Sequence, residues 1–386
     1  MRKPLFLLLM CSLVFLLCGC SGTTQVEDLA FAELLGVDLN ERNEIEVSIE
    51  VPKIAGQRGD SGSGSSGGSS PQLIYSADGE NFDEALNLLQ WAVPRRLDLS
   101  QIKLIVISRD IAESEFFASV ADTIMATPRL YTAARLAVCD GSAKEFISAE
   151  EPVIGTRLSS ELTATFEDYI RSGFIPDATF AGFYYSSRSI YSDPLAIHAE
   201  SAPKNEPASA TDGGAAPAAA IIPDNPQQSG VEMQHSNRFL GAAVFRKGCL
   251  AGRLSGEEYL YCKILRGEQQ TFPFSIDGRT VGLTTMGAPS VVIDTKSSPM
   301  KIRIGLNMSI VSSSKTAPKE SLQSALEEAF TDAIEACRRM GAEPLRLAEK
   351  AASAFLTIED WQEFNWTDHF LESEIDVGIR IFSSSE

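Results

Sequence analysis

The sequence has few of the residues and motifs around which most enzyme active sites are built. Its three histidines, His198, His235 and His369, are not spaced as metal ligands usually are. His198 and His235 lie in or beside a low-complexity region, which favours exposure to solvent. There is no HExxH pattern and no P-loop, and the run GSGSSGG reflects composition, because no strand-to-helix phosphate loop surrounds it. The sequence therefore predicts no catalytic residue, no metal site and no cofactor, and favours a protein that is not an enzyme.

Positive charge is also scarce. Lys and Arg number 33 against 52 Asp and Glu, which gives a formal net charge of −19. An acidic surface disfavours nucleic acid as a partner and provides no electrostatic attraction to anionic lipid. We therefore expect any attachment to a membrane to come from a covalent lipid or from protein partners.

The cysteines outside the first twenty residues are far apart and form no CxxC pair. They are Cys139, Cys249, Cys262 and Cys337. Cys249 and Cys262 lie on neighbouring apolar segments and are candidates to meet, but the spacing favours separate buried thiols.

The first residues have the three parts of an export signal. Arg2 and Lys3 supply positive charge, and the uncharged, mostly apolar run Pro4–Leu17 follows. This run is shorter than the roughly 20 apolar residues of a membrane-spanning helix. Residues 1–19 are therefore predicted to be a cleaved signal peptide.

The end of this leader, Leu17-Cys18-Gly19-Cys20, resembles the bacterial lipobox. That resemblance implies cleavage between Gly19 and Cys20 and lipidation of the Cys20 thiol. Cys18 stands where the lipobox more often has Ala or Ser, and cysteine is small enough to fit. The alternatives are an uncleaved anchor helix or cleavage without lipid. Two or three acyl chains would anchor the protein firmly, because each buried CH₂ contributes about 0.8 kcal/mol.

Changes in composition along residues 20–386 predict separate domains and a linker. The length of this part of the chain is typical of two or three domains. We expect a lipidated tether (20–23), an N-terminal domain (24–198) that can divide again near residue 115, an Ala/Pro/Ser-rich linker (199–236) and a C-terminal domain (237–386). The segment 199–236 can alternatively be a long loop within one domain.

Apolar periodicity predicts both strands and helices. Residues 45–51 alternate as a half-buried strand after a turn at Asn40–Asn43. Residues 82–93 are predicted to form a helix with Asn81 as its cap. Arg95-Arg96 can bind an anionic group, although a charge pair beyond the helix C-terminus is favoured.

The second half of the chain shows the same mixture. Arg246-Lys247-Gly248 predicts a hairpin between two short strands. An apolar stripe from Leu322 to Met340 predicts a long helix that ends near Gly341. We therefore expect an α+β fold of several domains, in which mostly antiparallel or mixed sheets are packed by helices.

Several stretches, in order along the chain, resemble one family. They are VEDLAFAELLGVDLN, LIYSADGENFDEALNLL, RRLDLSQIKLIVISRDIA, RLYTAARLAVCDGSAKEFI, FLGAAVFRKGCLAGRLSGEE and NWTDHFLESEIDVGIRI. Together with the lipobox they resemble the spore germination lipoproteins, the Ger(x)C family, which are C subunits of nutrient germinant receptors. The sequence departs from the family in two places: Ser21-Gly22-Thr23-Thr24 stands where a Trp-Asp pair usually follows the lipobox, and the Pro/Ala-rich segment 199–236 is long.

The resemblance implies a function and a location. It implies a non-enzymatic, lipid-anchored subunit on the extracytoplasmic, outer face of the spore inner membrane. It also implies that integral membrane A and B subunits of the germinant receptor are its partners in assembly or signalling.

Two other hypotheses remain open on the sequence. A lipid-anchored extracytoplasmic solute-binding protein of a transporter shares the lipidated N-terminus and two lobes, but its doubly wound lobes fit the alternating strand patterns less well. A tethered cell-wall enzyme would need an acid/base or metal site that the sequence does not indicate.

Overall fold

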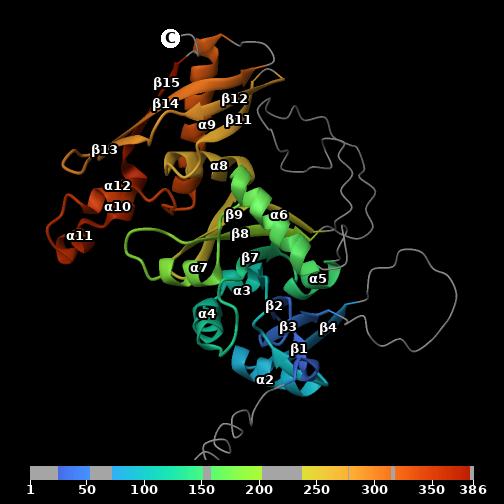
Figure 1. Cartoon of the computed structure of the whole chain (residues 1–386). Helices are drawn as coiled ribbons and strands as arrows, with labels where there is room; N and C mark the ends of the chain where they lie inside the picture. The colour runs from blue at the N-terminus through green and yellow to red at the C-terminus, as the bar shows by residue number, and fades with distance from the viewer. Residues whose placement is uncertain are drawn as a thin grey trace, which may run out of the picture.

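The computed structural model describes residues 25–52, 72–150, 158–201, 237–276, 278–313 and 318–382. Gly19 and Cys20, and residues 202–236 of the predicted linker, lie outside these ranges. The described residues form an elongated molecule with one mixed sheet in its lower half and a second sheet in its upper half (Figure 1). The predicted α+β fold with mixed sheets is confirmed.

The first sheet has a parallel centre and antiparallel edges. The parallel strands are β8 (Leu195–Ser201), β7 (Arg135–Asp140), β6 (Leu104–Ser108) and β2 (Leu34–Leu39), in that order across the sheet. At one edge the sheet continues antiparallel with β3 (Ile45–Val51) and β4 (Leu73–Gly79), and at the other with β9 (Asn237–Arg246) and β10 (Cys249–Ser255). The central strand β6, LIVIS, is fully buried, as a strand covered on both faces must be.

Helices cover both faces of this sheet. One face packs against α2 (Phe82–Ala92), α3 (Arg109–Glu113), α4 (Phe116–Ala126) and α7 (Phe180–Ser186). The other face packs against α5 (Ala143–Ala149) and α6 (Leu158–Ser172). A small parallel pair, β1 (Leu29–Phe31) and β5 (Arg96–Asp98), stands beside α2.

The second sheet is built around the long strand β14 (Lys301–Ser313). Its partners are β12 (Arg279–Thr285), β13 (Ser290–Asp294) and the parallel β15 (Glu374–Phe382), and β11 (Thr271–Ile276) pairs with β12. Helix α9 (Lys319–Arg339) packs its apolar stripe on this sheet, and α10 (Leu347–Ala352), α11 (Ile358–Phe364) and α12 (Trp366–Glu372) follow it.

Helix α8 (Gly256–Leu265) joins the two halves. It follows β10 of the first sheet directly, contacts β9 and β10, and packs along α9 of the second half. Leu260, Cys262 and Leu265 are all buried on it, which is expected for a helix covered on more than one side. A capping box formed by Ser255 and Glu258 fixes where it begins.

The local turn and cap predictions are confirmed. Lys247 and Gly248 both have positive φ, 51° and 85°, in the tight hairpin between β9 and β10. The Asn81 side chain accepts the Glu84 N–H at 3.0 Å, which caps α2. Helix α9 ends just before Gly341, whose φ is 66°.

The predicted domain boundaries remain a prediction, and the strand pairing adds a separate fact. Strands β8 and β9, which lie on either side of residues 202–236, are antiparallel neighbours in the first sheet. The chain therefore returns to the sheet it left before it continues through α8 into the second half.

Candidate functional site

The predicted lipidation residue Cys20 and its cleavage partner Gly19 lie outside the described residues. The described chain begins at Gln25 and forms a short 3-10 helix, η1 (Val26–Asp28), before β1. It enters the molecule beside α2, at the end farthest from β14 and β15 (Figure 1). In the described ranges, no helix is both long enough and apolar enough to cross a bilayer.

The junction between the two halves is the first candidate site. The loop 187–194, which joins α7 to β8, meets the segment that follows α9. The main-chain N–H of Glu343 donates to Asp193 Oδ2 at 2.7 Å, and Trp361 Nε1 donates to the Ile190 carbonyl at 3.3 Å. These contacts connect residues more than a hundred positions apart and fix the two halves against each other.

Glu343 is a buried carboxyl group at the centre of this junction. Its oxygens accept the N–H groups of Leu347 and Ala348, at 3.0 and 3.1 Å, at the start of α10. Burial, the largest cause, raises the pKa of Glu343 to about 8. Burial also raises the pKa of Asp193 above its usual range. The junction therefore contains two neighbouring carboxyl groups that resist ionisation.

Two cavities border the junction. One of about 220 Å³ is lined by Tyr191, Asp193, Glu343, Trp361 and Trp366 among others. A second, of about 340 Å³, is lined by Asp177, Lys263, Arg266 and Arg346 among others. Small-molecule sites usually measure about 300–1,000 Å³, so the second cavity is within that range and the first is below it. Neither cavity is lined by a histidine or a cysteine.

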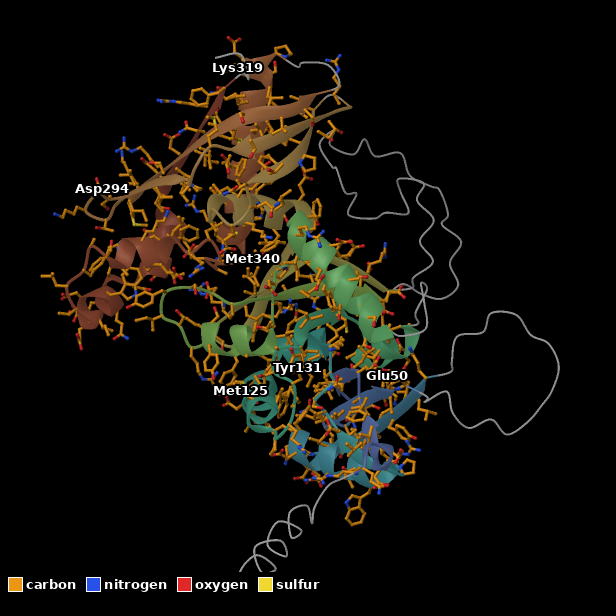
Figure 2. All side chains as sticks on the ribbon, in the orientation of Figure 1. Glu50, Met125, Tyr131, Asp294, Lys319 and Met340 are labelled. Carbon is orange, nitrogen blue, oxygen red and sulfur yellow. The ribbon has the colours of Figure 1, made fainter. Side chains whose placement is uncertain are left out.

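The side chain of Met340 packs closely on Gly252 of β10. A Cβ placed on Gly252 would lie 2.5 Å from Met340 Sδ, so a larger residue there would require the flexible Met340 side chain to shift. Met340, labelled in Figure 2, is the C-cap residue that directly follows α9.

A second cluster is formed by side chains of β7, β8 and β10, three strands of the first sheet in which β9 lies between β8 and β10. His198 Nε2 is 3.1 Å from Asp140 Oδ2 and 3.3 Å from Arg253 Nη1, and Arg253 also forms an ion pair with Asp140. His198 is 8% exposed, so its predicted exposure to solvent was wrong. Burial, the largest cause, lowers the pKa of His198 below its usual value and so favours the neutral ring. His369 is exposed and stacks on Phe364, and His235 lies outside the described residues.

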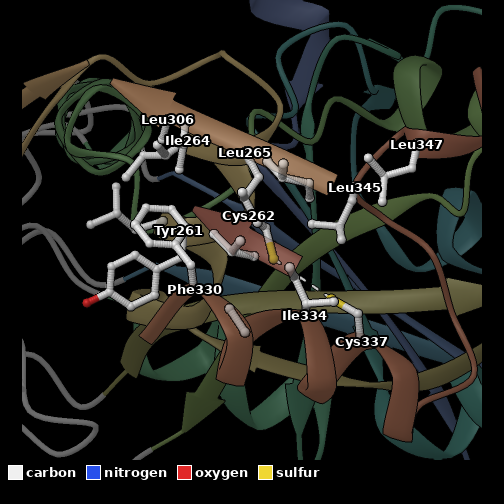
Figure 3. Packing of buried hydrophobic residues seen from close by; sticks show 14 of the residues in the cluster. Tyr261, Cys262, Ile264, Leu265, Leu306, Phe330, Ile334, Cys337, Leu345 and Leu347 are labelled. Carbon is white, nitrogen blue, oxygen red and sulfur yellow. Dashed lines mark hydrogen bonds between the residues drawn. The ribbon is translucent and has the colours of Figure 1, made fainter. Parts of the chain in front are cut away.

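The buried thiols do not pair as the sequence allowed. Cys262 Sγ lies 3.8 Å from Cys337 Sγ, across the α8–α9 contact (Figure 3). Cys249 Sγ instead approaches the Ser114 carbonyl at 3.9 Å. These three thiols and Cys139 are free. Cys249 and Cys262 therefore form no disulfide, and the sulfur neighbour of Cys262 is Cys337.

Strand β3 carries the most isolated polar groups. Glu50 is fully buried, and neither of its carboxylate oxygens has a hydrogen-bond partner (labelled in Figure 2). Burial, followed by the neighbouring Glu33, raises the pKa of Glu50 to about 8. Among the described residues, no group of three or more His, Cys, Asp or Glu side chains is placed to hold a metal ion.

Comparison with protein families accounts for most of the chain. Residues 22–200 match the spore germination protein N-terminal domain. Residues 240–382 match the spore germination B3/GerAC-like C-terminal domain. The two matches leave out the leader and a segment around residues 201–239.

Individual relatives are more distant. Spore germination protein KC of Bacillus subtilis is 28% identical over 146 residues, which are 38% of this chain and 36% of that protein. Protein YfkR of the same organism is 27% identical over 157 residues, 39% of each chain. The chain thus matches less than two fifths of the length of these curated relatives. The crystal structure of the GerBC protein covers 91% of this chain and 96% of its own, with 11% identity and a TM-score of 0.49.

Proposed function

This chain belongs to the spore germination GerAC family of germinant-receptor C subunits, and we propose that it is a lipid-anchored, non-enzymatic subunit of such a receptor. In this proposal Cys20 carries the lipid and holds the protein on the outer face of the spore inner membrane. Its partners are the integral membrane A and B subunits, and it contributes to receptor assembly or signalling.

The observation that carries the proposal is the position of the family match. The N-terminal family domain begins at residue 22, two residues after the lipobox cysteine, and the C-terminal one ends at residue 382. The N-terminal family domain thus follows the predicted attachment point almost directly.

Tethering would explain how a subunit with no membrane-spanning helix among its described residues can act in a receptor. A protein restricted to the membrane surface meets integral partners at a raised effective concentration. Weak contacts with those partners then suffice for assembly. The acidic composition gives no electrostatic attraction to anionic lipid, so the acyl chains would supply most of the membrane affinity.

The test replaces the thiol that would be lipidated. Cys20→Ala should move the protein from the membrane fraction to the soluble fraction of spore extracts and weaken nutrient-triggered germination. Cys18→Ala is the matched control, because alanine is usual at that lipobox position and should leave attachment unchanged. Membrane fractionation and normal germination retained by Cys20→Ala would contradict the proposed anchor.

Partners are tested separately. A C-terminally tagged chain from detergent-solubilised spore membranes should recover integral membrane germination subunits and a diacylglyceryl Cys20 peptide by mass spectrometry. Recovery with transporter permeases instead would exclude the receptor assignment.

One observation favours a second candidate, a solute-binding role. The cavity lined by Asp193, Glu343 and Trp361 lies between the two halves of the molecule, where binding proteins often hold ligands. A thermal-shift screen of the protein against amino acids and sugars tests this role, since a ligand that binds the folded state raises the melting temperature.

A further inference from the structure

Large apolar side chains are exposed at the end of the molecule where the described chain begins. Trp91 is 88% exposed and Leu88 is 47% exposed, three residues apart and so adjacent on the surface of α2. Val26 in η1 is 68% exposed. The opposite side of α2, with Phe82, is buried against the sheet.

Strand pairing brings these residues to one edge. β1 and β5 are parallel, with Leu29 opposite Arg96, so the segments that precede the two strands lie at the same end. The segment before β1 is η1 with Val26. The segment before β5 is the C-terminal end of α2 with Trp91, followed by the exposed Arg95. Val26, Leu88, Trp91, Arg95 and Arg96 are called the α2 face below.

The length of the tether limits how far this face can stand from a lipid anchor at Cys20. Four residues, 21–24, separate Cys20 from Gln25. Five Cα steps span at most about 18 Å even when fully extended. A bilayer that holds the acyl chains of Cys20 is therefore within one short tether of the α2 face.

We propose that the α2 face rests on the lipid bilayer, with the Trp91 indole in the interfacial region. This inference rests on the proposed anchor at Cys20. Tryptophan favours the membrane–water interface, Leu88 and Val26 offer further apolar contact, and Arg95 and Arg96 can bind lipid phosphates. Exposed Glu27 and Asp28 beside Val26 offset the arginines, so we expect binding to zwitterionic lipid as well as to anionic lipid.

The proposal also orients the molecule. The second sheet and α9 lie at the end opposite to α2 (Figure 1) and would point away from the membrane. The second half of the chain would then face the outer side, while the first sheet stands near the bilayer.

Tryptophan fluorescence tests the contact, because Trp91 is the exposed member of the three tryptophans. Trp361 and Trp366 are 4% and 7% exposed. The lipidated chain is reconstituted in phosphatidylcholine vesicles with or without brominated acyl chains, and its attachment is checked by flotation. We expect brominated lipid to quench part of the emission and vesicles to protect that part from aqueous iodide. Trp91→Phe should abolish the bromine-sensitive part.

A matched variant places the exposed tryptophan in the half of the molecule that contains the second sheet. Leu356, between α10 and α11, is 98% exposed. In the double variant Trp91→Phe, Leu356→Trp, the new indole should remain open to iodide and insensitive to brominated lipid. If Trp91 of a floating protein stays equally open to iodide and is not quenched by bromine, the contact is refuted while the anchor stands. A protein that does not float refutes the anchor and this inference together.

Discussion

The main-chain N–H of Glu343 donates to the Asp193 carboxylate at 2.7 Å, although the two residues are 150 positions apart. Asp193 belongs to the loop before β8 in the first sheet, and Glu343 follows α9 in the second half. This hydrogen bond is one of the contacts that hold the two halves together, and it predicts where the molecule is sensitive to substitution.

Asp193→Ala is expected to destabilise the junction. The substitution leaves the N–H of the buried residue Glu343 without its acceptor. The free energy of unfolding should therefore fall by about 2 kcal/mol. Asp193→Asn keeps an acceptor oxygen and should cost less. Urea unfolding measures the difference, with exposed Asp294→Ala as the control. If the Asp193→Ala and Asp294→Ala variants are equally stable, the hydrogen bond between Asp193 and Glu343 does not contribute to stability.

Stability is expected to fall as the pH rises from mildly acidic to mildly basic. Glu50, whose usual pKa is 4.5, has a pKa of about 8 in the fold. Between these values the folded state keeps a proton that the unfolded state has lost, so the folded state is progressively disfavoured until about pH 8. Each unit of raised pKa corresponds to about 1.4 kcal/mol, so the loss amounts to a few kcal/mol.

Glu50→Gln separates the contribution of Glu50 to the pH dependence of stability from that of Glu343, whose pKa is also about 8. The variant should be more stable than the parent at pH 8 and should show a shallower decline between pH 5 and 8. Exposed Glu41→Gln is the control and should leave the decline unchanged. If Glu50→Gln follows the parent curve at every pH, Glu50 is not a buried, protonated group.

Gly241→Ala is expected to disrupt the β9–β10 hairpin. A Cβ at this position would lie 2.1 Å from the Leu254 carbonyl oxygen, and backbone atoms cannot move aside as a flexible side chain can. We expect a loss of several kcal/mol, or insoluble protein, because the hairpin carries α8 into the second half. Gly378→Ala in β15 meets no atom within 4 Å and should be tolerated. Thermal melting of both variants checks the contrast, and similar melting temperatures would argue against it.

The free thiols are expected to differ in reactivity. Cys249 is half-buried, whereas Cys139, Cys262 and Cys337 are buried. The hydrogen bond between the Cys262 and Cys337 thiols, together with burial, raises the pKa of Cys337, and burial raises that of Cys139, so both resist forming the reactive thiolate. Alkylation of the native protein, mapped by peptide mass spectrometry, should modify Cys249 first and the others after denaturation. Early modification of Cys337 would show that the α8–α9 contact opens readily.

Local features could be predicted from the sequence because their causes are local. The Asn81 cap, the Lys247-Gly248 turn and the end of α9 near Gly341 depend on a few neighbouring residues. Their side-chain and backbone chemistry favours one conformation wherever they occur. The predicted lipobox, likewise, rests on four neighbouring residues and on no tertiary contact.

Sequence patterns did not reveal the contacts between residues that are distant along the chain. The low-complexity neighbourhood of His198 suggested exposure, yet His198 lies within β8, covered between β7 and β9 and close to Asp140. Cys249 and Cys262 are near in sequence, but Cys262 meets Cys337 because α8 packs along α9.

The sequence by itself determined the family, the α+β class and several caps and turns, since each of these follows from short stretches of residues, and it predicts the export leader in the same way. Only the tertiary structure decided that β9 returns to pair with β8, that Asp193 meets Glu343, and that Trp91 and Val26 share one edge. The apolar pattern of a strand or helix indicates that one of its faces is buried. It does not indicate which other element packs against that face. That choice depends on the packing of the whole chain, which joins residues far apart in the sequence.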